Sequence, residues 1–261
     1  MYFDALLHGG SLRRQEVEAL RFFGVAGALV PSGDGFHPAT ASRLRDHWGA
    51  TAAAARSLRA QGVKAWAALG IHPRRIPQRG LAERLADLPG WLDRPEVAAV
   101  GPCGLHLGGA AEEEVFLAQA RLSAELRLPL LVCAAVAAPR GRERLVRRLL
   151  TLLDEAEVEP ARVLLAHADA ASLPLLAARG HRALVTMPGR GGVEEAARLV
   201  RRHGPETIVL GSDAGDGGDP LALPRVADRL ARAGLSVAVI RRVVLGNALA
   251  WLGQPQEALD P

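Results

Sequence analysis

Residues 207–236 read TIVLGSDAGDGGDPLALPRVADRLARAGLS, and they contain one complete copy of the unit that builds this chain. Thr207–Asp213 is a short apolar run that ends in polar residues. Leu221–Ala233, after a glycine-rich turn, carries apolar residues at helical spacing. A buried strand, a polar loop and a covering helix in that order are typical of a β-then-α unit.

Upstream of this unit the same alternation occurs seven more times. The other apolar runs are short and often bounded by Gly or Pro, as parallel strands buried on both faces are. The expected strands before residue 207 are Tyr2–His8, Ala26–Pro31, Lys64–Ile71, Val97–Cys103, Pro129–Ala134, Val163–Ala168 and Ala183–Met187. The expected helices are Ser11–Phe23, Ala39–Gln61, Leu81–Asp93, Glu112–Arg127, Gly141–Ala156, Ala171–Arg179, Val193–His203, Leu221–Ala233 and Ser236–Leu252.

Eight units of roughly 30 residues predict a single α/β domain over residues 1–261, folded as a closed (β/α)8 TIM barrel. An open, doubly wound sheet is the alternative, because it also alternates strands and helices. The 261 residues contain no linker or low-complexity tract that would mark a second domain.

The basic charge of the chain does not by itself indicate that the protein binds nucleic acid. The formal net charge is +4, and Lys64 is the only lysine among the 32 basic residues. Arginine in place of lysine, in a chain rich in Ala, Gly and Leu, is typical of a GC-rich genome. The arginines also fall at helical spacing, as in RERLVRRLL (142–150). We therefore expect solvated helix faces and no nucleic-acid partner.

Two further features bear on location. No stretch of 18 apolar residues lacks a charge or a breaker, so no membrane span is expected. The first residues, MYFDALLHGG, include an early acid and no basic region, which does not resemble a signal peptide. We expect a cytoplasmic protein in which Cys103 and Cys133 are not disulfide-bonded.

In such a barrel the active site lies at the carboxyl ends of the strands. Here those ends carry groups able to bind metals or move protons: Asp4, His8, His72, Cys103, His106, Cys133, His167, Asp169, Ser212, Asp213 and Asp216. Four other histidines fall in loops or helices away from these ends and are expected at the surface: His37, His47, His181 and His203.

Taken in order, these strand ends resemble those of the TatD-like metal-dependent hydrolases, which are amidohydrolase-type barrels. The family's D-x-H-x-H, G-I-H-P and G-E-x-G-L-D motifs correspond to DALLH (4–8), GIHP (70–73) and GPCGLH (101–106). Its later histidines and aspartate correspond to positions in LPLLVC (128–133), VLLAHAD (163–169) and VLGSDAG (209–215). Residues 211–236 and RRVVLGNALAWLG (241–253) are similar to a branch found in bacterial gene clusters for lipid or secondary-metabolite export.

The resemblance implies a site with two divalent metals, but several of its ligands are replaced. Leu6 stands at the first histidine and Pro102 at the bridging glutamate, and neither side chain can ligate a metal. Cys133 stands at the histidine of the fifth strand. Because the bridging carboxylate spaces and neutralises the metal pair, we do not expect a two-metal site.

Three of the implied ligands are kept: His8, His167 and Asp213. We expect no resident cofactor and assign these three residues as catalytic, because a histidine beside an aspartate can act as a general base near neutral pH. The alternative is one Zn²⁺ held by His8, Cys133, His167 and Asp213, since a thiolate is a good zinc ligand.

We assign substrate binding to His72, His106 and Arg190. Arg190 lies in the GRGG turn (189–192) after the seventh strand, where backbone N–H groups at a helix start can hold an anion. The expected partner is thus a small-molecule substrate with an anionic group. The oligomeric state stays open.

These observations favour a hydrolase-derived enzyme that acts on a small molecule in a bacterial biosynthetic or export pathway. Two alternatives remain. One is a non-catalytic barrel that binds a metabolite or a protein partner, which the lost ligands favour. The other is a metal-dependent TatD-type nuclease or phosphoesterase, which needs the missing ligands.

Overall fold

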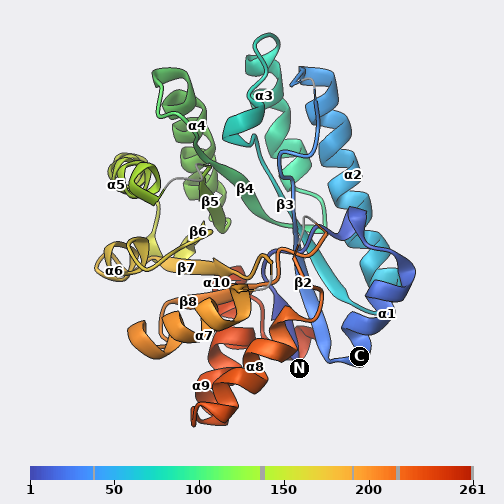
Figure 1. Ribbon diagram of the computed structural model, residues 1–261. Helices are drawn as coiled ribbons and strands as arrows, with labels where there is room; N and C mark the ends of the chain where they lie inside the picture. The colour runs from blue at the N-terminus through green and yellow to red at the C-terminus, as the bar shows by residue number, and fades with distance from the viewer. Residues whose placement is uncertain (38, 136–138, 190, 216–217, 260–261) are drawn as a thin grey trace.

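A computed structural model of the chain describes residues 1–37, 39–135, 139–189, 191–215 and 218–259. Eight parallel strands form one sheet in the order β1 to β8, and the helices surround it (Figure 1). The strands are β1 (Tyr2–Asp4), β2 (Val25–Pro31), β3 (Lys64–Leu69), β4 (Val97–Leu105), β5 (Leu130–Ala134), β6 (Val163–Ala166), β7 (Arg182–Thr186) and β8 (Ile208–Gly211).

Sequential strand order is that of a barrel and not of a doubly wound sheet, whose order reverses at a switch point. The last and first strands also meet, because Asp213 N–H donates to Leu6 O at 3.0 Å and Leu7 bridges Ala214. The predicted (β/α)8 barrel is confirmed, and the open sheet is excluded.

The helices follow the strands as the periodicity predicted. They are α1 (Arg14–Phe22), α2 (Ala41–Ala60), α3 (Leu81–Leu92), α4 (Ala110–Leu126), α5 (Pro139–Glu155), α6 (Ser172–Ala177), α7 (Gly192–His203), α8 (Ala222–Arg232), α9 (Val237–Arg241) and α10 (Asn247–Leu252). In α2, for example, Thr40 caps the first turn by accepting Arg43 N–H, and Leu44, Trp48 and Ala55 bury one face at helical spacing. None of the helices that the structure describes is long and apolar enough to cross a membrane.

Most element ends lie within three residues of the prediction, and two elements differ more. The first strand was expected over Tyr2–His8 but ends at Asp4, where the Asp4 carboxylate accepts Leu6 N–H and the chain leaves the regular ladder. The last helix was expected as one segment over Ser236–Leu252. It is divided by a π-helical turn, η4 (Arg242–Gly246), just before Asn247, whose amide donates to Pro205 O and Ile208 O.

Candidate active site

The carboxyl ends of β6 and β8 are held in an unusual backbone conformation. His167 has φ 56° and Asp213 has φ 59°, although neither is glycine. Left-handed backbone is uncommon for such residues and costs energy, and outliers of this kind cluster at functional sites. Two of the three residues predicted to be catalytic therefore have this conformation, which Arg127 and Glu157, after α4 and α5, also adopt.

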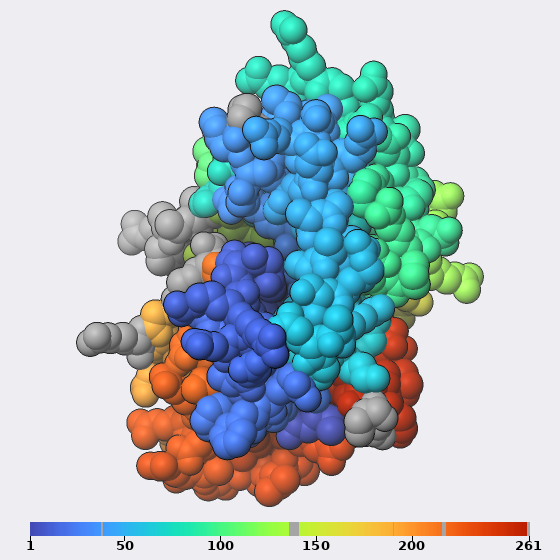
Figure 2. All heavy atoms as spheres, turned by 90° about the vertical axis from the view of Figure 1, so that its right-hand side faces the viewer, coloured from blue at the N-terminus to red at the C-terminus, as the bar shows by residue number. Residues whose placement is uncertain are grey.

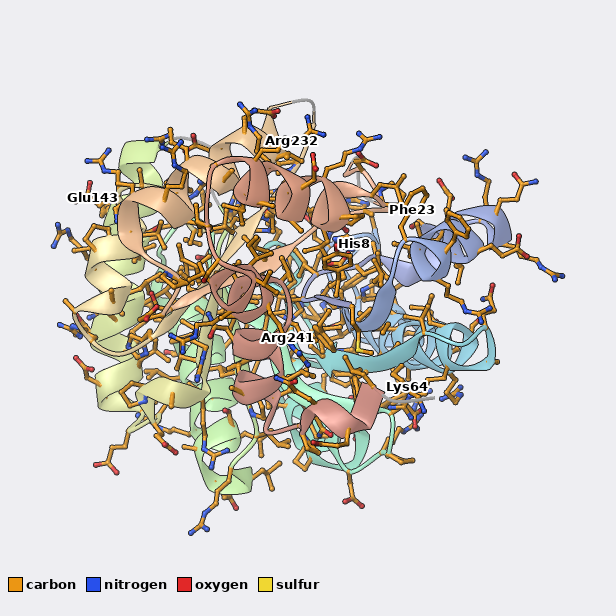
Figure 3. The ribbon with its side chains drawn as sticks, turned by 90° about the horizontal axis from the view of Figure 1, so that it is seen from below. His8, Phe23, Lys64, Glu143, Arg232 and Arg241 are labelled. Atoms are coloured by element: carbon orange, nitrogen blue, oxygen red, sulfur yellow. The ribbon has the colours of Figure 1, made fainter. Side chains whose placement is uncertain are left out.

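His8 and Asp213 form a pair across the point where the barrel closes. His8 Nε2 lies 3.2 Å from Asp213 Oδ1, and the two side chains are 23% and 12% exposed. In the view from below, His8 lies nearer the centre of the molecule than Glu143 or Arg232, which lie among the outer helices (Figure 3). The carboxylate orients the imidazole, and a part-buried imidazole in contact with an anion is suited to proton transfer.

A buried carboxylate supports this pair. Asp4 is fully buried, and its Oδ1 accepts Ser212 N–H at 2.9 Å and Leu6 N–H at 3.2 Å. Its Oδ2 accepts the Ser212 hydroxyl, whose oxygen in turn accepts Ala214 N–H. These bonds fix the residues on both sides of Asp213. Burial raises the pKa of Asp4 to about 6, although its hydrogen bonds with Ser212 oppose the rise.

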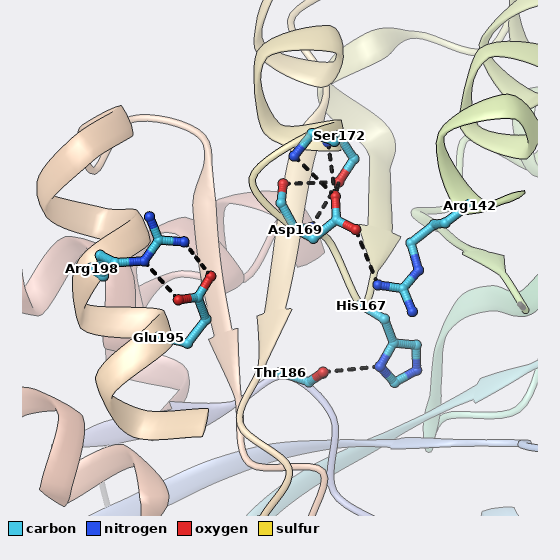
Figure 4. Close-up of polar contacts among 8 residues, drawn as sticks. Arg142, His167, Asp169, Ser172, Thr186, Glu195 and Arg198 are labelled. Carbon is cyan, nitrogen blue, oxygen red and sulfur yellow. Dashed lines mark hydrogen bonds and ion pairs between the residues drawn. The ribbon is translucent and has the colours of Figure 1, made fainter. Parts of the chain in front are cut away.

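His167 lies at the end of β6 and contacts the end of β7. Its Nδ1 is 2.9 Å from Thr186 Oγ1 (Figure 4). Nearby, Asp169 accepts Ser172 N–H at the start of α6 and lies 3.2 Å from Arg142 Nη1. The Asp169 carboxylate is thus occupied by the start of α6 and by α5, which leaves His167 as the proton-transfer candidate of this strand end.

His72 follows β3 and lies close enough to His167 for the two rings to interact electrostatically. His72 Nδ1 accepts Arg74 N–H at 3.3 Å in the short helix η2 (Pro73–Arg75). Burial lowers the pKa of His72 to about 4, while the Asp34 carboxylate acts in the opposite direction. His72 is therefore a neutral group at pH 7.

Asp34 is a site residue that the sequence analysis missed. It lies in the loop after β2, its Oδ2 is 3.4 Å from Arg74 Nη1, and its carbonyl accepts Arg75 Nε at 2.8 Å. Burial raises the pKa of Asp34, but the charges of protonated His72, Arg74 and Arg75 outweigh this effect and hold the pKa below the usual range. Its position three residues after a strand end was the signal that could have found it.

His106 and Arg74 converge on one carbonyl at the end of β5. His106 Nδ1 lies 2.6 Å from Ala135 O, and the Arg74 guanidinium donates to the same oxygen from Nε and Nη2. Glu112 accepts the backbone N–H groups of the loop that carries His106. One ring nitrogen of His106 is used in this contact. The assignment of His106 to substrate binding stays a prediction. Arg190 and Asp216 lie outside the described residues.

The donors present do not fit the two-metal centre of the family pattern. Leu6 is buried where a histidine would ligate, and Pro102 is buried within β4. Burial raises the pKa of the Cys133 thiol to about 12, and the nearby Asp34 carboxylate adds to this. Burial likewise raises the pKa of Cys103. Within the described part of the chain, no three His, Cys, Asp or Glu residues are grouped to hold a metal ion. The mononuclear zinc site stays a prediction.

Two histidines expected at the surface are not there. His181 is 1% exposed, with Nδ1 3.3 Å from Pro160 O. His47 is half-buried on the inner side of α2, where its ring stacks against Phe36 at a centroid distance of 4.8 Å. For His47 the expectation was wrong because helical spacing did not reveal that Phe36 of the β2–α2 loop packs against α2, and for His181 because the segment before β7 packs against η3 (Pro160–Arg162).

The lowered pKa of His72 gives a testable prediction. A histidine whose pKa is 6.5 when unfolded and about 4 when folded stabilises the protein above pH 6.5, and this contribution is lost as the pH falls toward 4. In a pH titration followed by NMR, the His72 ring signals should change near pH 4. Asp34→Asn should move this midpoint lower, because the Asp34 carboxylate raises the pKa of His72. A His72 midpoint near 6.5 would contradict this assignment.

Comparison with known proteins identifies the family of the chain. The family model of TatD-related DNases matches residues 12–250. The chain belongs to the TatD family. A protein of this family's fold class, a TatD-like protein from Archaeoglobus fulgidus, superposes with a TM-score of 0.77 at 25% identity and covers 97% of this chain and 100% of that one.

Among curated proteins, this TatD-family chain is 23% identical over 248 residues to an uncharacterized metal-dependent hydrolase of Methanocaldococcus jannaschii, which covers 94% of the chain and 97% of the relative. The phosphotriesterase homology protein of Escherichia coli, solved with phosphate in its active site, superposes with a TM-score of 0.69 at 17% identity and covers 96% and 98% of the two chains. That likeness shows the shared barrel fold. Family membership makes hydrolysis the leading reaction class for this chain.

Proposed function

We propose that this TatD-family protein is a hydrolase of small molecules that uses His8 and Asp213 as a general-base pair in place of the two-metal centre. The 3.2 Å contact between His8 Nε2 and Asp213 Oδ1 is the observation that carries the proposal. The pair lies at the carboxyl ends of β1 and β8, where barrel enzymes place their chemistry.

In the proposed reaction, the Asp213 carboxylate accepts a hydrogen bond from His8 Nε2 and so directs the base function to Nδ1. His8 takes a proton from water, and the resulting hydroxide attacks the scissile centre. The proton then passes to the leaving group, which restores neutral His8. Asp213 stabilises the imidazolium in between. We propose that His167 and His72, which follow β6 and β3, contact the substrate.

A second candidate is a metal-dependent nuclease, and the description of the family model as TatD-related DNases favours it. It requires the metals whose ligands Leu6 and Pro102 replace. A mononuclear zinc enzyme lies between the metal-free hydrolase and the two-metal nuclease in its ligand requirement. It needs only about three protein ligands, among them Cys133 as thiolate.

Metal content and chelation separate these three functions. We expect protein purified without added metal to contain substoichiometric zinc, manganese and magnesium by mass spectrometry. We also expect it to hydrolyse chromogenic carboxylic or phosphoric esters at the same rate before and after treatment with EDTA. Inactivation by EDTA with recovery on one equivalent of Zn²⁺ would support the mononuclear site. Cleavage of single-stranded DNA only with Mg²⁺ or Mn²⁺ would support the nuclease.

A further inference from the structure

A cavity of about 270 Å³ opens beside His8, next to the carboxyl end of β2 and the segment that follows β8. It lies between the β1–α1 segment, the β2–α2 loop and α2, and the space-filling view shows the face on which the N-terminal segment and α2 lie side by side (Figure 2). Its lining includes His8, Asp34, His47 and Thr51. One end of the proposed general-base pair thus faces a space large enough for a small molecule.

The cavity is kept open by residues that have little or no side chain. Gly10, Gly33, Gly35, Ala50 and Ala54 all line it. A Cβ atom added at Gly35 would meet nothing within 4 Å, and one at Gly33 would lie 3.4 Å from His8 Cε1. Larger side chains at these positions would occupy the space beside the His8 ring.

The polar groups of the lining indicate which ligands suit it. Among the described residues that line the cavity there is no arginine or lysine. Asp34 supplies an acceptor carboxylate, since its pKa is held below the usual range. Ser11 contributes a hydroxyl, and the glycines of the lining contribute backbone groups. Asp34 is paired with Arg74, which does not itself line the cavity, so a phosphate in this space would face a carboxylate and no lining arginine or lysine.

We propose that this cavity is a binding pocket for an uncharged, hydroxyl-rich small molecule, with Asp34 accepting hydrogen bonds from its hydroxyl groups. Binding beside His8 places such a molecule within reach of the base, and this last step alone rests on the proposed function. With the proposed hydrolysis, the pocket changes the expected substrate from an anionic molecule to an uncharged ester or glycoside of a polyol or sugar-like compound, whose hydroxyl-rich part the pocket binds.

The test uses the full-length protein and three matched probes: xylitol, xylitol 5-phosphate and pentamethyl xylitol. Binding is followed by amide chemical shifts in two-dimensional NMR. We expect xylitol to shift the amides of Gly33, Gly35 and Thr51, and we expect the phosphate and the methyl ether, which lacks hydroxyl donors, to bind at least tenfold more weakly.

Two neighbouring alanines of α2 provide a matched pair of variants. Ala54 lines the cavity, whereas Ala53 is exposed beside it on the same helix. Ala54→Leu should weaken xylitol binding at least tenfold by filling the cavity, and Ala53→Leu should leave it unchanged. Asp213→Asn should also retain binding, which separates this pocket from the chemistry of the His8–Asp213 pair.

The outcomes are decisive in both directions. Selective xylitol binding that Ala54→Leu removes supports the pocket even when no turnover is detected. Tighter binding of the phosphate, equal effects of the two leucine variants, or no binding by xylitol would overturn it. None of these binding results tests the proposed general-base pair, which is tested separately by the activity of Asp213→Asn.

Discussion

Asp213→Asn is expected to lower kcat/KM by about 10²–10⁴-fold, the usual contribution of a positioned general base. The change removes the negative charge that stabilises protonated His8 across the 3.2 Å contact. It should leave the fold intact, because asparagine adopts the left-handed backbone that Asp213 holds at φ 59° more readily than most residues do. The Asn substitution thus removes the charge of the Asp213 side chain and keeps the backbone conformation of this residue.

The measurement is the turnover of the best chromogenic substrate across a pH range, together with thermal unfolding of each variant. Asp46→Asn is the control, because Asp46 is an exposed carboxylate on α2 and the same chemical change there should not affect kcat/KM. If Asp213→Asn retained more than about a third of wild-type activity, a difference of less than 1 kcal/mol in transition-state stabilisation, the pair would not be the base.

Asp4→Ala is expected to destabilise the protein by about 2 kcal/mol at pH 7 and by about 5 kcal/mol at pH 4. Three buried donors, from Leu6 N, Ser212 N and Ser212 Oγ, lose their acceptor, and each orphaned donor costs roughly 1–3 kcal/mol. At pH 7 part of this cost is offset, because the variant no longer buries an ionised carboxylate.

The sign of the pH dependence follows from the raised pKa of Asp4. Between its unfolded value of 3.8 and its folded value of about 6, the folded protein binds more protons, so its stability falls as the pH rises through this window. The difference between the two pKa values corresponds to roughly 3 kcal/mol. Urea unfolding of wild type and variant at pH 4, 5, 6 and 7 measures it.

Asp4→Asn is the matched control for charge. It keeps one acceptor oxygen for the two backbone N–H groups and has no titrating proton, so we expect it to be within about 1 kcal/mol of wild type at pH 7. Relative to wild type it should lose about 3 kcal/mol between pH 7 and pH 4. If the free energies of unfolding of the wild type and the Asn variant changed in parallel with pH, Asp4 would not titrate in this range.

The fold could be predicted from the sequence because it depends on local patterns of apolar and polar residues. The alternation of apolar runs and amphipathic segments, as in residues 207–236, is repeated eight times, and each unit must bury a strand on both faces. The ends of the strands and helices were predicted less accurately. The early end of β1 depends on the Asp4 carboxylate bonding to Leu6 and to Ser212, a residue 208 positions away.

The candidate site was predicted in part. The barrel rule placed His8, His167 and Asp213 at the strand ends, and the structure pairs His8 with Asp213. Asp34 and His47 were missed, since their roles depend on how the β2–α2 loop folds against α2. Whether Cys133 takes part in metal binding stays a prediction, although its burial and raised pKa are known only from the fold.

Residue types and local periodicity were enough to predict the barrel and the order of its strands, whereas the loss of metal ligands at Leu6 and Pro102 is what the family resemblance implies. Which polar groups meet, which of them are desolvated and where a cavity remains became known from the folded chain. The His8–Asp213 contact, the buried Asp4 and the cavity beside His8 all depend on residues distant in the chain, whose distances no local pattern specifies.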